Sequence, residues 1–94
     1  MKVLGVHSSD KPKKKYYAEL EKDSGRTKRV YFGAAGMSDY TINKDPKRKE
    51  RYITRHQARE DWSNPETPGF WARWVLWNQT NKAESIADAK RRAL

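Results

Sequence analysis

The first third of the chain alternates between hydrophobic and polar residues, which is the pattern of strands with one buried face. In residues 16–22 this alternation places Tyr16, Ala18 and Leu20 on one face and Tyr17, Glu19 and Glu21 on the other. The Asp-Ser-Gly segment 23–25 predicts a turn, because glycine adopts the positive φ that tight connections need. A second alternating stretch then turns Val30 and Phe32 inward.

We therefore predict a β-hairpin over residues 13–36, preceded by a short first strand and turn over residues 1–12. Together they make a three-stranded antiparallel meander. Residues 37–44 have too few regularly spaced hydrophobic residues to form an element of their own.

The second half of the chain predicts three helices, over residues 45–61, 69–78 and 81–93. Asp45 and Pro46 indicate a helix start, since aspartate caps the first turn and proline fits it. Hydrophobic residues nearly encircle the second helix, which makes it the central packing element. Core packing is therefore a better interpretation than base stacking for its three tryptophans, Trp71, Trp74 and Trp77.

These elements predict an α+β fold: a small three-stranded antiparallel meander followed by three α-helices in a single compact domain, residues 1–94. A chain of 94 residues has room for only one small core. It has no cysteine, which excludes disulfides and thiolate metal sites. No apolar run approaches the roughly 18 residues of a membrane span, so we expect no membrane partner.

Charge narrows the choice of partner. The chain carries 21 Lys and Arg residues against 12 Asp and Glu, a formal net charge of +9. This balance favours an anionic partner such as nucleic acid. Four Trp, five Tyr and two Phe argue against a disordered polyelectrolyte, because a solvated tail has few large rings to bury.

The most informative basic residues fall on the first predicted helix. Arg48, Arg51, Arg55 and Arg59 are spaced by three, four and four residues, so they form one stripe, here called the arginine ridge. At 1.5 Å rise per residue the ridge spans roughly 16 Å. Guanidinium groups offer paired donors that suit phosphate oxygens or guanine edges. The alternative is a solvated helix face whose arginines pair with nearby carboxylates.

Further basic residues lie on the predicted hairpin. One run is next to its first turn and another sits just across the hairpin: Lys13, Lys14 and Lys15, and Arg26, Lys28 and Arg29. Such clusters bind phosphate without reading sequence, or serve solubility alone. Tyr17 and Tyr31 point away from the predicted core and are candidates for contact with a nucleic acid.

Catalytic signals are sparse. His7 and His56 are the only histidines, and His56 with Glu60 four residues later puts two metal-ligand types on one helical face. A packed histidine beside an exposed glutamate is the simpler interpretation. The Gly33–Gly36 segment lacks the Lys and Ser/Thr of a phosphate-binding loop. We assign no catalytic residue, metal ligand or cofactor. Whether the protein is an enzyme stays open, and the residues favour a protein without enzymatic activity.

Several short motifs are spread over residues 13–92: Phe32–Thr41 (FGAAGMSDYT), Lys44-Asp45, Arg48-Lys49, Arg51-Tyr52-Ile53, Arg55-His56, Trp62, Pro65, Gly69-Phe70-Trp71, Arg73-Trp74, Leu76-Trp77-Asn78 and Ser85-Ile86-Ala87-Asp88. Together these motifs resemble a family of small uncharacterised proteins of large double-stranded DNA viruses that infect algae and protists. The resemblance implies a viral setting, with the protein in the host nucleus or cytoplasm or inside the virion, but it implies no activity.

A second set of residues comprises Tyr17, Gly25, Tyr31-Phe32-Gly33, and Arg51 or Arg55 with His56. This set is similar to the pattern of the GIY-YIG nucleases, in which a hairpin holds paired tyrosines and a following helix carries an arginine beside a histidine or tyrosine. The first motif lacks its glycine, reading Lys15-Tyr16-Tyr17. The metal-binding glutamate has no clear equivalent, with Glu60, Glu66 and Glu84 all available.

Taken together, the residues predict a small basic protein that binds nucleic acid, double-stranded DNA before RNA, by phosphate contacts from the arginine ridge. The alternative is a virion structural or interaction protein, whose charge faces packaged genome or an acidic surface of a viral or host protein partner. A degenerate nuclease is a third interpretation. The oligomeric state is left open.

Overall fold

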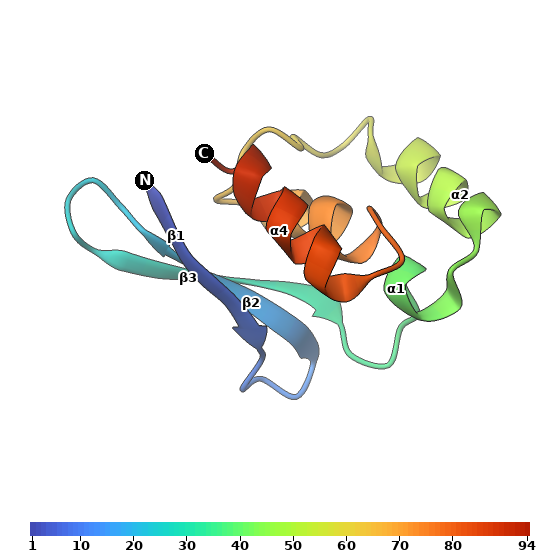
Figure 1. Cartoon of the computed structure of the whole chain (residues 1–94), viewed down its shortest axis with the longest axis horizontal. Coiled ribbons are helices and arrows are strands. Elements are labelled where there is room, and N and C mark those ends of the chain that lie inside the picture. Colours follow the sequence, from blue (N-terminus) through green and yellow to red (C-terminus); the bar gives the residue numbers. More distant parts are fainter.

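The computed structural model describes residues 1–94 and shows a three-stranded sheet followed by helices; the helical segment in orange packs on the sheet, and the green helices lie beyond its end (Figure 1). The strands are β1 (Lys2–Ser8), β2 (Lys14–Glu21) and β3 (Thr27–Ala34), antiparallel and in the order β1-β2-β3. The predicted α+β class and the antiparallel meander are therefore confirmed.

The hairpin register follows the hydrophobic alternation. Ala18 pairs with Val30 on the covered face, and Tyr17 pairs with Tyr31 on the opposite face. The β2–β3 turn contains Gly25 at φ 85°, the left-handed conformation for which glycine was expected there. The residues that the helices bury on the covered face are those predicted: Ala18, Leu20, Val30 and Phe32.

The segment 37–44, expected to be a loop without an element, contains the one-turn helix α1 (Tyr40–Asn43). Periodicity missed this helix because its ends, rather than a hydrophobic face, hold it. Asp39 is 2% exposed and accepts hydrogen bonds from the backbone N–H and the hydroxyl of Thr41. Lys44 closes the turn in the left-handed conformation, with φ 52°.

Helix α2 (Pro46–His56) begins as predicted, with the Asp45 side chain accepting from the Lys47 N–H, but it ends five residues before the predicted Asp61. The correction has a tertiary cause. The chain leaves the helical path to bring Trp62 under the Arg73 guanidinium, whose carbon lies 5.4 Å from the indole centroid. The Trp62 carbonyl there accepts from Trp74 Nε1 (3.0 Å).

The helix predicted over 69–78 is present as α3 (Pro68–Trp71), which continues into a π-helical turn, η1 (Ala72–Leu76). The widened turn is closed by the Trp77 N–H, which donates to the Ala72 carbonyl (3.1 Å). Its tryptophans are core residues as predicted: Trp71 is fully buried, Trp77 is 9% exposed and Trp74 packs against the core.

The last helix, α4 (Lys82–Arg92), is capped by Asn81, whose side chain accepts from the Glu84 N–H (3.0 Å). Its buried face carries small residues, Ser85 and Ala89, so α4 packs closely on η1. None of the helices has the length and apolar character needed to span a bilayer.

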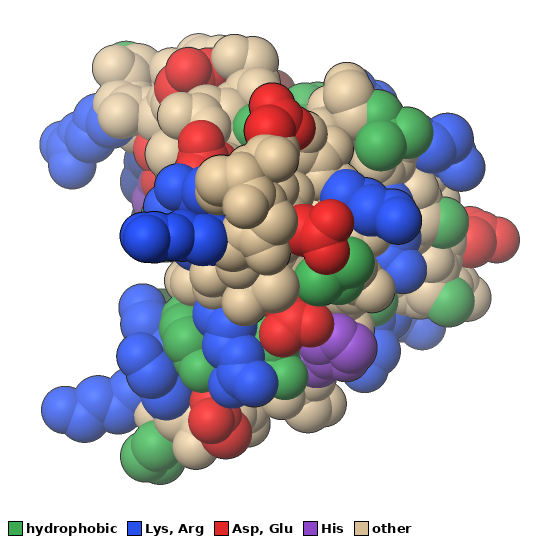
Figure 2. All heavy atoms as spheres, turned by 90° about the vertical axis from the view of Figure 1, so that its left-hand side faces the viewer, with side chains coloured by type: hydrophobic (Ala, Val, Ile, Leu, Met, Phe, Trp, Pro, Cys, Tyr) green, Lys and Arg blue, Asp and Glu red, His purple; other side chains and the backbone are tan.

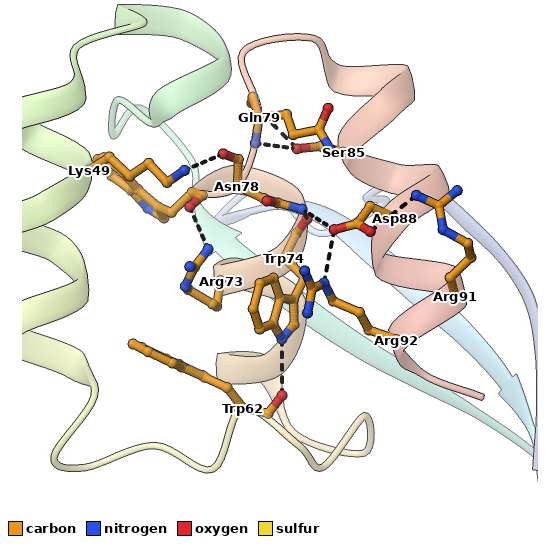
Figure 3. Close-up of polar contacts among 11 residues, drawn as sticks. Lys49, Trp62, Arg73, Trp74, Asn78, Gln79, Ser85, Asp88, Arg91 and Arg92 are labelled. Carbon is orange, nitrogen blue, oxygen red and sulfur yellow. Dashed lines mark hydrogen bonds and ion pairs between the residues drawn. The ribbon is translucent and has the colours of Figure 1, made fainter.

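A polar network joins α4 to the segment after η1 (Figure 3). The Asp88 carboxylate accepts from Asn78 Nδ2 (2.7 Å), Arg92 Nε (2.9 Å) and Arg91 Nη2 (3.1 Å). Arg92 also stacks on Trp74, with its guanidinium carbon 3.7 Å from the ring centroid. The hydrogen bond from Arg92, followed by that from Asn78, lowers the pKa of Asp88 to about 2.

This pKa gives a prediction for acid stability. Because the folded pKa is below the unfolded value of about 3.9, Asp88 stabilises the protein fully above pH 4, and the contribution is lost as pH falls through 2. We expect Asp88→Asn to lower the free energy of unfolding by about 1–2 kcal/mol at pH 7, with the difference from the parent closing near pH 2. Urea unfolding at several pH values measures this.

The matched control is Glu84→Gln, on the same helix, whose carboxylate has no ion-pair partner. We expect it to lower the free energy of unfolding by less than about 1 kcal/mol, because this exposed carboxylate interacts only with the helix dipole at the start of α4. A loss in Asp88→Asn that is the same at pH 2 and pH 7 would contradict the assignment, because such a loss would come from packing rather than from charge.

Candidate nucleic-acid interface

Helix α2 is held to the rest of the protein by a stack of three rings. Tyr52 is 6% exposed, and its ring lies 4.7 Å from that of Trp77 at an interplanar angle of 8°. The His56 ring covers the other face of Tyr52, at 4.2 Å and 22°. Burial, with the nearby Glu60 carboxylate, raises the pKa of the Tyr52 hydroxyl. The stack therefore fixes which side of α2 faces inward.

Lys49 makes the second attachment of α2. Its ammonium group donates to the backbone carbonyl of Asn78 (2.6 Å) and lies 4.9 Å from the Tyr40 ring centroid (Figure 3). Burial, with the positive charge of Arg73, lowers the pKa of Lys49. This lysine is an internal anchor, although it lies in the same basic stretch as the ridge.

The arginine ridge faces solvent. Arg48, Arg51 and Arg55 are exposed on α2, and Arg59 is exposed just beyond its end. None of the four guanidinium groups forms an ion pair or a side-chain hydrogen bond. The alternative, in which these arginines pair with nearby carboxylates, is therefore not observed. The helical part, from Arg48 to Arg55, is about 10 Å long, shorter than the predicted ridge.

The turn that ends α2 keeps Arg59 near the ridge. Its backbone N–H donates to the carbonyl of His56 (3.0 Å). Arg59 then lines one surface hollow together with Arg55 and His56. The four arginines thus remain neighbours even though the helix does not reach the fourth.

A groove of about 320 Å³ lies between the hairpin and α2; we call it the hairpin–helix groove. Lys14 and Lys15 come from β2 on one side, and Arg55 and His56 come from α2 on the other. Its apolar wall includes Phe32, Leu76 and Trp77. The fold therefore brings one end of the lysine run and one end of the arginine ridge to a single opening, which the sequence did not indicate.

Gly33 allows the hairpin to approach the helices here. Its φ is +78°, and a Cβ at this position would lie 2.8 Å from Leu76 Cδ1. Both the conformation and the space therefore require glycine.

The three lysines of the run differ. Lys15 is mostly buried, and its ammonium group contacts the Asp39 carboxylate at 2.5 Å. This pair cancels the charge of both groups, so Lys15 supports the wall of the groove rather than offering a free cation. Lys13 and Lys14 are exposed and have no carboxylate partner.

The second hairpin cluster lies elsewhere. In the strand register Lys14 pairs with Ala34, whereas Lys28 pairs with Leu20 near the opposite end of the hairpin. Lys28 Nζ lies 3.8 Å from Glu66 Oε1. Arg29 reaches Asp10 (3.5 Å) and Glu19 (3.8 Å), and Arg26 is exposed beside the β2–β3 turn. Arg26, Lys28 and Arg29 are thus not joined to the lysine run.

Tyr17 and Tyr31 form a ring row on the sheet face that the helices leave open. Their centroids are 5.3 Å apart, and His7 extends the row at 5.2 Å from Tyr17. The Tyr31 hydroxyl donates to Asp10 (2.8 Å), which lowers the pKa of that carboxyl. The Arg29 guanidinium lies 4.4 Å from the Tyr17 ring centroid.

In Figure 2 a histidine lies beside hydrophobic, basic and acidic side chains on the exposed surface at the sheet end of the molecule. Successive residues of a strand point to opposite faces of the sheet, so the paired tyrosines lie on the face opposite Phe32 and the groove that Arg55 and His56 line. The structure does not bring together the tyrosines and the Arg-His pair on which the nuclease resemblance depends.

His56 and Glu60 do meet, with His56 Nδ1 3.4 Å from Glu60 Oε1. The same oxygen accepts a hydrogen bond from Trp62 Nε1 (3.0 Å). No group of three or more metal-ligating side chains is assembled here or elsewhere in the chain. The pair is a structural contact at the end of α2 and borders the groove.

Comparison with known proteins gives one match. Residues 4–56 match the model of a family of unknown function, DUF5754. The matched segment is more than half of the chain and runs from β1 to the last residue of α2. It contains the basic residues of the groove and three arginines of the ridge. No curated protein and no solved structure matches the chain.

The ring stack gives a prediction for α2. We expect Tyr52→Ala to cost about 3 kcal/mol of unfolding free energy, since it removes a buried ring from between Trp77 and His56. Because α2 has few other attachments, its amides should lose more protection from hydrogen exchange than those of β2 and β3. The control, Tyr52→Phe, keeps the stack and removes a hydroxyl that makes no hydrogen bond, so it should cost under about 1 kcal/mol. Equal loss of protection in sheet and helix would contradict this role.

Proposed function

The chain belongs to the DUF5754 family, and we propose that it binds nucleic acid, double-stranded DNA in preference to RNA, by contacts between its arginine ridge and backbone phosphates. The single observation that carries the proposal is the lack of any internal partner for Arg48, Arg51, Arg55 and Arg59. Residues 46–59 hold six Lys and Arg side chains and one carboxylate, Glu50.

Electrostatics supports this use of the ridge. Like charges three and four residues apart on a helix repel each other, which destabilises the free helix by a few tenths of a kcal/mol per pair. An anion bound along the ridge removes that repulsion. The arrangement therefore favours a partner that carries a row of negative charges over a partner that carries a single negative charge.

The dimensions of the ridge suit a duplex. Duplex DNA carries one negative charge per about 1.7 Å of its axis, so the 10 Å from Arg48 to Arg55 faces about six phosphate charges. Exposed guanidinium groups bind phosphate oxygens through paired N–H donors. Lys14, across the groove from Arg55, and the exposed Lys13 extend the basic surface toward the hairpin.

The other predicted contacts have weaker support. Lys15 is neutralised by Asp39, and Lys28 and Arg29 are close to carboxylates. Tyr17 and Tyr31 lie on the far side of the sheet. A ligand on the ridge does not reach them unless it wraps around the molecule, so we assign them no part in duplex binding.

The test compares two variants with the same loss of charge. In the first, Arg48, Arg51 and Arg55 are changed to Gln; in the second, Lys2, Arg26 and Lys90, which are exposed and unpaired, are changed to Gln. Binding of a random-sequence duplex is titrated over salt. The slope of log K against log salt should fall by about 0.9 per ridge arginine in the first variant, with at least about a hundredfold loss of affinity near 0.1 M salt.

The control variant should lose far less affinity, through the long-range field alone, and should keep the slope of the parent. Equal losses in the two variants would show that net charge, not the ridge, determines binding. If the parent binds no duplex at low salt, the proposal is wrong; self-assembly under the same conditions would then favour the alternative of a structural or interaction protein.

A further inference from the structure

We propose that the hairpin–helix groove binds a single nucleotide whose base carries an exocyclic amino group, with the phosphate at Lys14 and Arg55 and the base against the apolar wall. This inference deepens the proposed function and rests on it, because the groove opens beside the arginine ridge. It adds a binding site for a base, which the phosphate contacts proposed for α2 do not include.

The size and polarity of the groove suit such a ligand. Its volume of about 320 Å³ is within the range of sites for small organic ligands. Phe32, Leu76 and Trp77 make an apolar wall, and the free cations Lys14 and Arg55 lie at the rim. A flat base with one attached phosphate has the same division into an apolar part and an anionic part.

Glu60 adds a hydrogen-bond acceptor to the lining of the groove. Its carboxylate lines the groove and is about a quarter exposed. Oε1 already accepts from Trp62, while Oε2 has no hydrogen-bond partner. A carboxylate repels phosphate and accepts N–H groups. A ligand that satisfies both the cations and this carboxylate has N–H donors separate from its anionic group, as guanine, cytosine and adenine nucleotides have and uracil and thymine nucleotides have to a smaller extent.

The Glu60 carboxylate is held in place by close contacts with its neighbours. A Cβ at Gly69 would lie 2.9 Å from Glu60 Cδ and 3.0 Å from Oε2, so the absence of a side chain at Gly69 makes room for Glu60 against the start of α3. Its Oε1 also faces His56 Nδ1 at 3.4 Å. Glu60 is thus held from two sides, and its Oε2, beside Gly69, makes no hydrogen bond within the protein.

The two cations at the rim of the groove form no ion pair and are available to a ligand. Lys15, the other lysine of the groove, is paired with Asp39, which takes no further cation. Lys14 and Arg55 have no carboxylate partner. Arg55 also lines the two neighbouring hollows of the ridge, one with Arg59 and one with Arg51. A nucleotide in the groove is therefore within reach of a strand bound along α2, at an end or at an unpaired position.

The experiment titrates the full-length protein with GMP, CMP, UMP and inorganic phosphate by calorimetry, with amide chemical shifts to locate the site. We expect GMP and CMP to bind with the amides of Gly33, Ala72 and Leu76 shifting. UMP and inorganic phosphate should bind about tenfold more weakly or worse, the effect of one charge-assisted hydrogen bond or more.

Two pairs of variants test the location. Ala34→Trp fills the groove from β3 and should abolish GMP binding, while Ala35→Trp, at the next residue and outside the groove, should not. Arg55→Gln should weaken GMP binding about tenfold, while Arg26→Gln, an exposed arginine beside the hairpin turn, should leave it unchanged. Glu60→Gln should remove the preference for GMP over UMP.

Three results would overturn the inference: no binding of GMP or CMP up to about 10 mM, GMP binding that survives both Ala34→Trp and Arg55→Gln, or inorganic phosphate binding as tightly as GMP. Duplex binding is measured on the same unaltered protein. Duplex binding without nucleotide binding rejects the groove alone, and nucleotide binding without duplex binding rejects the ridge alone.

Discussion

The stacking of Tyr52 on Trp77 is the contact on which the functional surface depends. It joins α2 to the end of η1 at 4.7 Å with nearly parallel rings. Lys49, bonded to the carbonyl of Asn78, fixes the rotation of the helix about its axis. With these two side chains turned inward, Arg48, Arg51 and Arg55 must face solvent, and Arg55 must face the hairpin across the groove. A short helix with no other extensive packing is thereby held as a fixed basic edge.

The sequence was sufficient for those parts of the fold that local pattern controls. The alternation around Ala18 and Val30 predicted the hairpin and its buried face, and the run of hydrophobic residues around Trp71 predicted the central element. Local sequence pattern did not predict the elements whose presence or length depends on contacts between residues distant in sequence. The buried Asp39 holds a helix turn that has no hydrophobic periodicity, and the packing of Trp62 under Arg73 ends α2 early.

The candidate site also has features that the sequence predicts and features that depend on tertiary packing. The arginine ridge could be predicted from spacing alone, but whether its members were paired could not, because ion pairs depend on where carboxylates from other segments lie. Lys15 and Lys14 are neighbours in sequence, yet only Lys15 meets a carboxylate. The groove could not be predicted at all, since Lys14, Arg55 and Glu60 come together only through tertiary packing. Asp39 lies 24 residues from Lys15 along the chain, so no local signal marked this lysine as structural.

The most direct test of the central claim is to follow the arginine side-chain Nε–H signals of isotope-labelled protein while a short DNA duplex is added. The account predicts that the signals of Arg48, Arg51 and Arg55 shift together and early, with those of Arg29 and the amides around Tyr17 and Tyr31 unaffected. Shifts confined to the open sheet face, with the α2 signals unmoved, would contradict it.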